Sequence, residues 1–153
     1  MPRIVALDVG DATIGVAASD ELHLIASPVR TIRRARGVKA DLKQVGDALK
    51  ELDACKVVIG LPLDAEGKEG IQAWKVKDFS DRLSRRVTIP IEFWDERFST
   101  ADAEDRLIKM DASRARRKER IHSAAAAVIL ESWLREAESG KQIADSGWRI
   151  ADG

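Results

Sequence analysis

A single carboxylate at the end of an apolar segment is the feature that most constrains this chain. Asp8 follows the run Ile4–Leu7 and precedes Val9 and Gly10. A run with no polar face is typical of a central strand that is covered on both sides of a sheet. A carboxylate there costs on the order of several kcal/mol unless a partner offsets it. Asp8 therefore either faces such a partner or caps the following turn by accepting hydrogen bonds from backbone N–H groups.

The pattern of apolar residues predicts strands and helices in alternation. Strands are predicted at Arg3–Val9 and Thr13–Ser19 (a hairpin), around Pro28 (Leu22–Ala26 with Val29–Ile32), at Lys56–Gly60 and at Ile89–Trp94. Helices are predicted at Val38–Asp53, from Ile71 to Leu83, after a capping box of Ser99 and Asp102, and at Ile121–Leu134 with an end at Gly140. Pro62–Gly70 is predicted to be a loop.

This order indicates an α/β fold with a mixed β-sheet flanked by helices on both faces. The sheet starts antiparallel and continues through right-handed crossovers to parallel strands. We expect one domain over residues 1–138 and a polar C-terminal tail over residues 139–153, which we expect to be disordered.

The composition excludes several classes of protein. The formal net charge is zero, so the chain as a whole lacks the basic character of many nucleic-acid-binding proteins. The lone Cys55 cannot form an internal disulfide and is expected to be a small core residue. No apolar run is long enough to span a membrane, so we expect a cytoplasmic protein with no membrane partner. As a separate expectation, the protein is a monomer or weak homodimer.

Charge is nevertheless segregated along the chain. Residues 92–105 carry six acids against Arg97, residues 114–120 carry five bases against Glu119, and residues 30–43 carry six bases against Asp41. Such segregation suits a protein that holds a cation in one place and a polyanion beside it. The alternative is that these runs are solvated helix faces.

A second carboxylate is predicted to lie near the first. Glu96 follows the strand that ends near Trp94, and parallel strands would bring Asp8 and Glu96 to the same edge of the sheet. Two carboxylates that meet there repel each other unless a divalent cation such as Mg²⁺ intervenes. The alternative is that Glu96 forms an ion pair with Arg97 or with a nearby helix.

Four segments in order resemble the YqgF/RuvX family of pre-16S rRNA nucleases, which are related to Holliday-junction resolvases. They span roughly residues 3 to 135 and are Ala6–Gly10 with Ile14–Asp20, Val58–Leu63 with Gly67 and Gly70, Asp95–Thr100 with Ala103 and Glu104, and Ile121–Ser132. The first segment is the least specific, because actin-like ATPases share an Asp-x-Gly turn. The other segments make the resemblance strong.

The resemblance implies an RNase H-like fold and a metal-dependent phosphodiesterase site. Asp8 and Glu96 carry over as catalytic, metal-binding carboxylates, and His122 stands where the family has its third acid at the start of the last helix. The loop also departs from the family, with Asp64 in place of Asn. Imidazole is a poor Mg²⁺ ligand and suits Mn²⁺ or Zn²⁺ better. His122 either ligates the metal, orients a water molecule, or is a structural hydrogen-bonding residue.

The function implied is metal-assisted hydrolysis of RNA phosphodiester bonds, in 5′-end maturation of pre-16S rRNA during ribosome biogenesis. The resemblance implies Mg²⁺ or Mn²⁺ as the cofactor, with Mn²⁺ favoured if His122 ligates. We expect precursor rRNA or a ribosomal particle as the substrate, and structured DNA is the alternative partner. The predicted RNA-binding residues are Arg97, Arg114, Arg116, Arg117 and Lys118. The alternatives are a catalytically weakened RNA-binding maturation factor and a Holliday-junction resolvase.

Overall fold

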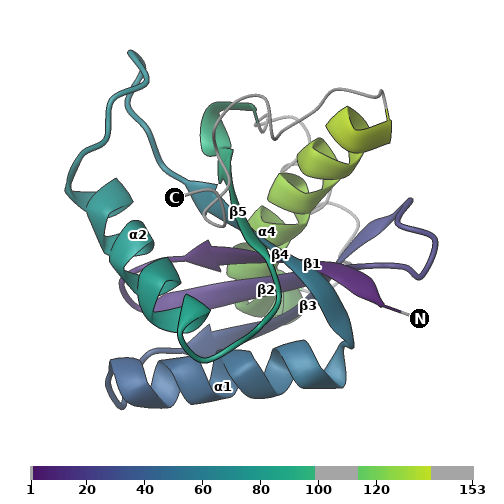
Figure 1. The fold of residues 1–153 in the computed structure, drawn as a ribbon, viewed down its shortest axis with the longest axis horizontal. Helices are drawn as coiled ribbons and strands as arrows, with labels where there is room; N and C mark the ends of the chain where they lie inside the picture. The colour runs from purple at the N-terminus through teal and green to yellow at the C-terminus, as the bar shows by residue number, and fades with distance from the viewer. Residues whose placement is uncertain (1, 99–113, 139–153) are drawn as a thin grey trace.

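The computed structural model describes residues 2–98 and 114–138, with side chains for residues 2–98 and 123–137. Within these ranges lie strands β1 (Arg3–Val9), β2 (Thr13–Ser19), β3 (Ala26–Arg33), β4 (Ala54–Leu61) and β5 (Ile91–Asp95). The helices are α1 (Val38–Glu51), α2 (Ile71–Ser84), the short 3-10 helix η1 (Glu96–Phe98) and α4 (Arg114–Glu138). Figure 1 shows the single sheet that these helices surround.

The strands form one mixed sheet in the order β3-β2-β1-β4-β5. β1 pairs antiparallel with β2 and parallel with β4, and β5 continues the parallel part. The predicted hairpin, the parallel crossovers and the α/β class are therefore confirmed. The carboxyl ends of β1, β4 and β5 meet at one edge, here called the C-terminal edge. β2 begins and β3 ends at this same edge, because both pair antiparallel.

Helices cover both faces of the sheet, as predicted (Figure 1). One core holds α1 and α2 against the side chains of Val5, Leu7 and Ile59, among others. The other core, on what we call the α4 face, packs α4 against Ile4, Ala6, Val58 and Trp94. Successive strand residues point to opposite faces, so a strand with helices on both sides needs apolar residues at every position. This explains why the run before Asp8 has no polar face.

The third strand differs from the expectation. β3 is one continuous strand that passes through Pro28, and it excludes Leu22–Ile25. Pro28 pairs with Ala17 beside a register shift. β3 is an outermost strand of the sheet, with a neighbouring strand on one side only, so the missing N–H of proline is tolerated there. The residues before β3 form a turn in which Asp20 Oδ1 accepts hydrogen bonds from the N–H groups of Leu24 (2.7 Å) and Ile25 (2.9 Å).

The last helix also corrects the prediction. We expected it to begin at Ile121, but α4 begins at Arg114, so the basic run over residues 114–120 is part of the helix. The segment contains only Arg, Ala, Lys and Glu, which favour helix, and no Gly or Pro that would end one. His122 therefore lies in the third turn of α4 and does not open it.

The remaining predicted elements lie within a few residues of their observed bounds. Cys55 is a half-buried residue of β4 that packs beside the core of the α4 face, which confirms its expected role. The helix predicted after Ser99, the helix end at Gly140 and the tail over residues 139–153 lie outside the described residues. Of the helices described, none has the length and apolarity needed to cross a membrane.

Candidate active site

Asp8 lies at the C-terminal edge of β1, on the α4 face. Ile4 and Ala6 pack in the core of that face, and alternation along the strand places Asp8 on the same side. Its partner across the hairpin is Gly15, which has no side chain to cover it. Asp8 is partly exposed, whereas the four residues before it are buried. The carboxylate is thus the first polar group of β1 within reach of a ligand at this edge.

Glu96 follows β5 directly, and its side chain lies over Gly60 of β4. A Cβ atom on Gly60 would be 3.0 Å from Glu96 Cγ, 3.3 Å from Glu96 Cδ and 2.5 Å from Ile129 Cδ1. Continuing the parallel register of β1 and β4 by one position puts Gly60 beside Asp8. Because Gly60 has no side chain, the Glu96 carboxyl group can lie over β4. It is then about 5 Å, the spacing of adjacent strands, from β1. The structure therefore brings Asp8 and Glu96 to the same edge of the sheet, as the sequence predicted.

Two other acids of β5 have structural partners. Glu92 is 1% exposed, and its carboxylate accepts from Lys56 Nζ (2.6 Å) and Trp133 Nε1 (3.0 Å). Asp95 is also buried and pairs with Arg97. The three described acids of the acidic run are therefore divided between the core and the edge. These two acids stabilise the fold, which leaves Glu96 as the acid of β5 and η1 on the candidate site.

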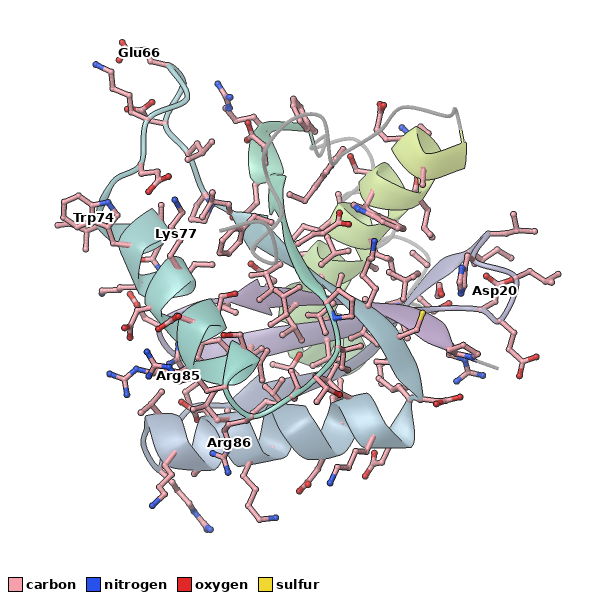
Figure 2. The ribbon with its side chains drawn as sticks, viewed as in Figure 1. Asp20, Glu66, Trp74, Lys77, Arg85 and Arg86 are labelled. Carbon is pink, nitrogen blue, oxygen red and sulfur yellow. The ribbon has the colours of Figure 1, made fainter. Side chains whose placement is uncertain are left out.

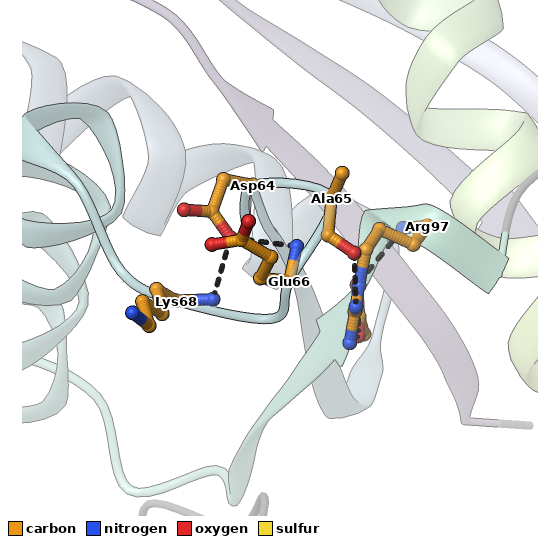
Figure 3. Close-up of polar contacts among 6 residues, drawn as sticks. Asp64, Ala65, Glu66, Lys68 and Arg97 are labelled. Carbon is orange, nitrogen blue, oxygen red and sulfur yellow. Dashed lines mark hydrogen bonds and ion pairs between the residues drawn. The ribbon is translucent and has the colours of Figure 1, made fainter.

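Arg97 connects β5 to the loop after β4. Its Nε and Nη2 donate to Asp95 Oδ2 at 2.9 Å and 2.6 Å, and its Nη1 donates to the Ala65 carbonyl at 3.5 Å (Figure 3). The hydrogen bond to Asp95 raises the pKa of the guanidinium. The alternative for Glu96 was an ion pair with Arg97, and in the structure Asp95 makes this ion pair. The Arg97 side chain is 40% exposed, and its contact with nucleic acid stays a prediction.

The loop between β4 and α2 is a small hairpin-like structure organised by Asp64. Leu63 and Glu69 form an isolated antiparallel bridge. Asp64 Oδ1 accepts hydrogen bonds from the N–H groups of Glu66 (2.9 Å) and Lys68 (2.8 Å), as Figure 3 shows. An Asn side chain has the same acceptor oxygen. The departure from the family pattern at Asp64 therefore preserves the geometry of the loop and adds a negative charge.

The turn after Asp8 is held by a residue that the sequence analysis did not single out. Arg34 Nη1 donates to the Gly10 carbonyl (2.6 Å), its backbone N–H donates to Ala12 O (2.9 Å), and its Nε pairs with the buried Asp41 (2.9 Å). This fixes the turn from β1 to β2. A basic residue just after a strand gives no distinctive pattern, so only the fold reveals this role.

The predicted residues of α4 are placed through their backbone alone. Arg114, Arg116, Arg117 and Lys118 form its first turns, and His122 lies seven residues, about two helical turns, before Ile129. Ile129 is the α4 residue that contacts the Gly60 position beside Glu96. The side chains of residues 114–122 lie outside the described ones, so their contacts with the two acids remain a prediction.

The donor set at this edge suits a hard divalent cation. Asp8 and Glu96 supply oxygen ligands, and the space over Gly60 keeps the second carboxyl group close to β1. Such ligands match Mg²⁺ or Mn²⁺. Among the residues with described side chains, no group of three or more His, Cys, Asp and Glu is arranged to hold a metal. A third ligand would thus have to come from a residue such as His122.

The strand order and the helices on both faces define an RNase H-like α/β fold. The T. thermophilus RuvC structure in complex with a Holliday junction substrate has a similar fold, with a TM-score of 0.65 at 16% identity, covering 90% of this chain and 96% of that chain. A second structure of Thermus thermophilus RuvC gives a TM-score of 0.62 at 12% identity, covering 91% and 97% of the two chains.

Sequence comparison identifies the family. The family model RuvX, described as a Holliday junction resolvase, matches residues 2–136. Two relatives named "Putative pre-16S rRNA nuclease" each align over 132 residues, or 86% of this chain. The Myxococcus xanthus relative is 44% identical with 87% of its length covered, and the Clostridioides difficile relative is 45% identical with 93% covered. The chain belongs to the RuvX family.

Proposed function

We propose that this protein is a metal-dependent nuclease that hydrolyses phosphodiester bonds of precursor rRNA. One observation carries the proposal: the Glu96 carboxyl group lies over Gly60. Gly60 belongs to β4, which pairs directly with β1, the strand that holds Asp8. The names of the RuvX relatives support pre-16S rRNA as the substrate. Action on precursor rRNA would place the protein in the cytoplasm.

The two acids would hold the cation between β1 and β5. Asp8 is fixed by the central strand, and Glu96 by the start of η1. His122 would complete the ligand set or orient a water molecule. When bound, a divalent ion would activate a water molecule and stabilise the leaving oxygen of the phosphodiester.

Protein residues around the acids position the reacting groups. Arg34 holds the turn after Asp8, and Arg97 holds the loop after β4. Both contacts link loops at the C-terminal edge to the strands, which helps to keep the two acids in place. The basic first turns of α4 would contact phosphates of the substrate.

A catalytically weakened RNA-binding maturation factor is the second candidate. His122 favours it, because the site would hold one negative charge fewer than the family pattern. A Holliday-junction resolvase acting on DNA is the third candidate, supported by the description of the family.

The proposal is tested by incubating the pure protein with precursor rRNA fragments in Mn²⁺ or Mg²⁺, alongside a four-way DNA junction. We expect RNA cleavage, reduced roughly a hundredfold or more in Asp8→Asn and in Glu96→Gln, because no remaining group can hold the ion. RNA binding without cleavage in any metal would support the maturation factor. Cleavage of the junction but not of RNA would support the resolvase.

A further inference from the structure

The basic run over residues 30–43 divides into two kinds of residue in the structure. Three of its bases pair with acids: Arg30 with Glu51 (2.6 Å), Arg34 with Asp41 (2.9 Å) and Lys43 with Asp47 (3.1 Å). The other three are Arg33, Arg36 and Lys39, which are exposed and have no side-chain partner among the residues with described side chains. We call these three residues the β3–α1 basic surface.

This surface starts on the same face and edge of the sheet as Asp8. Asp8 pairs with Gly15, and Gly15 pairs with Thr31, so these three residues share one face. Arg33 is two residues beyond Thr31 and is therefore on the α4 face as well. Ile32, between them, packs in the opposite core. β3 is two strands from β1, so the backbone of Arg33 lies about 10 Å sideways from that of β1.

The segment is fixed relative to the candidate active site. Arg34 bonds both Gly10 O and Asp41, and its backbone N–H donates to Ala12 O. The bases before and after it, Arg33 and Arg36, are thus attached to a rigid point next to the Asp8 turn. This anchors the backbone of both bases near Asp8, which reduces the ordering that binding of a polyanion requires.

The fold itself gives these bases no structural role. Arg33 ends an edge strand, and Arg36 lies in the connection to α1. Lys39 lies in the first turn of α1, where a positive charge is slightly unfavourable because the helix N-terminus carries a partial positive charge. These three bases lie at the end of the sheet that also carries the two acids, with Arg33 on the α4 face and Lys39 on α1, which packs on the opposite face. They fit an extended anion that passes the acids and continues around the end of β3.

We propose that Arg33, Arg36 and Lys39 bind phosphates of the substrate strand on the β3 side of Asp8. The inference rests on the proposed function for its ligand, RNA. The basic turns of α4 would contact the same strand elsewhere, since α4 packs against β2 and β3 on the face where Arg33 lies.

Fluorescence anisotropy with a labelled single-stranded RNA of about 20 nucleotides tests the surface, in EDTA so that metal-dependent cleavage cannot occur. The triple variant R33A/R36A/K39A is compared with the wild type from low to high salt. Removing one bound phosphate should reduce the slope of log affinity against log salt by about 0.7, so the slope should fall by roughly two units in the triple variant. The melting temperature should change little, because exposed charges contribute little to stability.

The matched control removes three other exposed bases, K50A/R82A/R85A. Lys50 lies in the last turn of α1, and Arg82 and Arg85 pair with acids one turn away on α2 (Figure 2 shows Arg85). The net charge changes equally in both triple variants, and the control should keep the wild-type slope. Equal slopes in the two triple variants, or no binding by the wild type, would overturn the inference. Cleavage by the wild type is scored separately, so the nuclease proposal stands or fails independently.

Discussion

The backbone of Gly60 lies directly against the side chain of Glu96, with 3.0 Å between the position of a Cβ atom and Glu96 Cγ. Gly60→Ala would also bring the new methyl group to 2.5 Å from Ile129 Cδ1. We expect destabilisation by about 1–3 kcal/mol from this overpacking. Cleavage should fall by roughly tenfold or more, because a displaced carboxylate no longer holds the ion in a productive position.

Gly46→Ala is the control for this change. Gly46 lies inside α1, where no atom comes within 4 Å of an added Cβ. Alanine is favoured over glycine in a helix by about 1 kcal/mol, so this variant should melt at a higher temperature and cleave at the wild-type rate. Thermal unfolding and cleavage assays on both variants check the contrast. A Gly60→Ala protein with normal activity would show that Glu96 does not need its present position.

Glu92 and Glu96 are four residues apart, and the structure predicts opposite outcomes for the same substitution. Glu92→Gln removes the charge that pairs with the partly exposed Lys56, and we expect a loss of stability of about 1–3 kcal/mol. Cleavage below the melting temperature should be unaffected. Glu96→Gln should do the reverse, with folding retained and cleavage abolished. Urea titration and initial rates distinguish the two, and a shared pattern would contradict the division of the acidic run.

Much of this arrangement follows from the sequence, because alternation and helical periodicity are local. The apolar run before Asp8 predicted a central strand, and parallel crossovers predicted the shared edge with Glu96. The sequence could not decide whether Asp95 or Glu96 pairs with Arg97. Adjacent residues at a strand end point to opposite faces of the sheet. Which of the two acids lies beside Arg97 therefore depends on where β5 ends, and in the structure it ends at Asp95.

The start of α4 and the role of Gly60 were not predictable for different reasons. The apolar pattern of α4 begins near Ile121. The turns before it consist of residues that favour helix, but they lack the apolar stripe by which an amphipathic helix is recognised in a sequence. A glycine that makes room for a side chain from another strand depends on tertiary contacts. Similarly, Arg30 and Arg33 are equivalent in the sequence, and only the fold, which brings Glu51 of α1 beside Arg30, separates the paired base from the unpaired one.

His122 predicts a metal preference. If it ligates, a nitrogen donor stands where the family pattern has oxygen, and the wild type should cleave faster in Mn²⁺ than in Mg²⁺. His122→Asp should shift the preference toward Mg²⁺. Cleavage rates in titrations of each metal give the measurement. Identical metal profiles for the two proteins would mean that residue 122 does not contact the ion.

The basic first turns of α4 predict a second set of phosphate contacts. Neutralising Arg116, Arg117 and Lys118 together should flatten the salt dependence of RNA binding by roughly two units of slope and weaken binding at low salt. Because these residues lie in a helix, alanine is the substitution that keeps the backbone. Anisotropy with labelled RNA measures the slope, and circular dichroism confirms that α4 is retained. An unchanged slope would remove these turns from the binding surface.

Asp20 predicts how stability depends on pH at the far end of β2. Hydrogen bonds from the N–H groups of Ile25 and Leu24 lower the pKa of its carboxyl group below the ordinary value of 3.8. A carboxylate with a lowered pKa in the folded state stabilises the protein above its unfolded pKa, and this contribution disappears as the pH falls through the folded pKa. The wild type should therefore melt higher than Asp20→Ala at pH 7, and the difference should shrink below about pH 4. Thermal unfolding of both proteins from pH 3 to pH 7 provides the measurement. A difference that stays constant over this range would mean that the charge on Asp20 does not stabilise the turn.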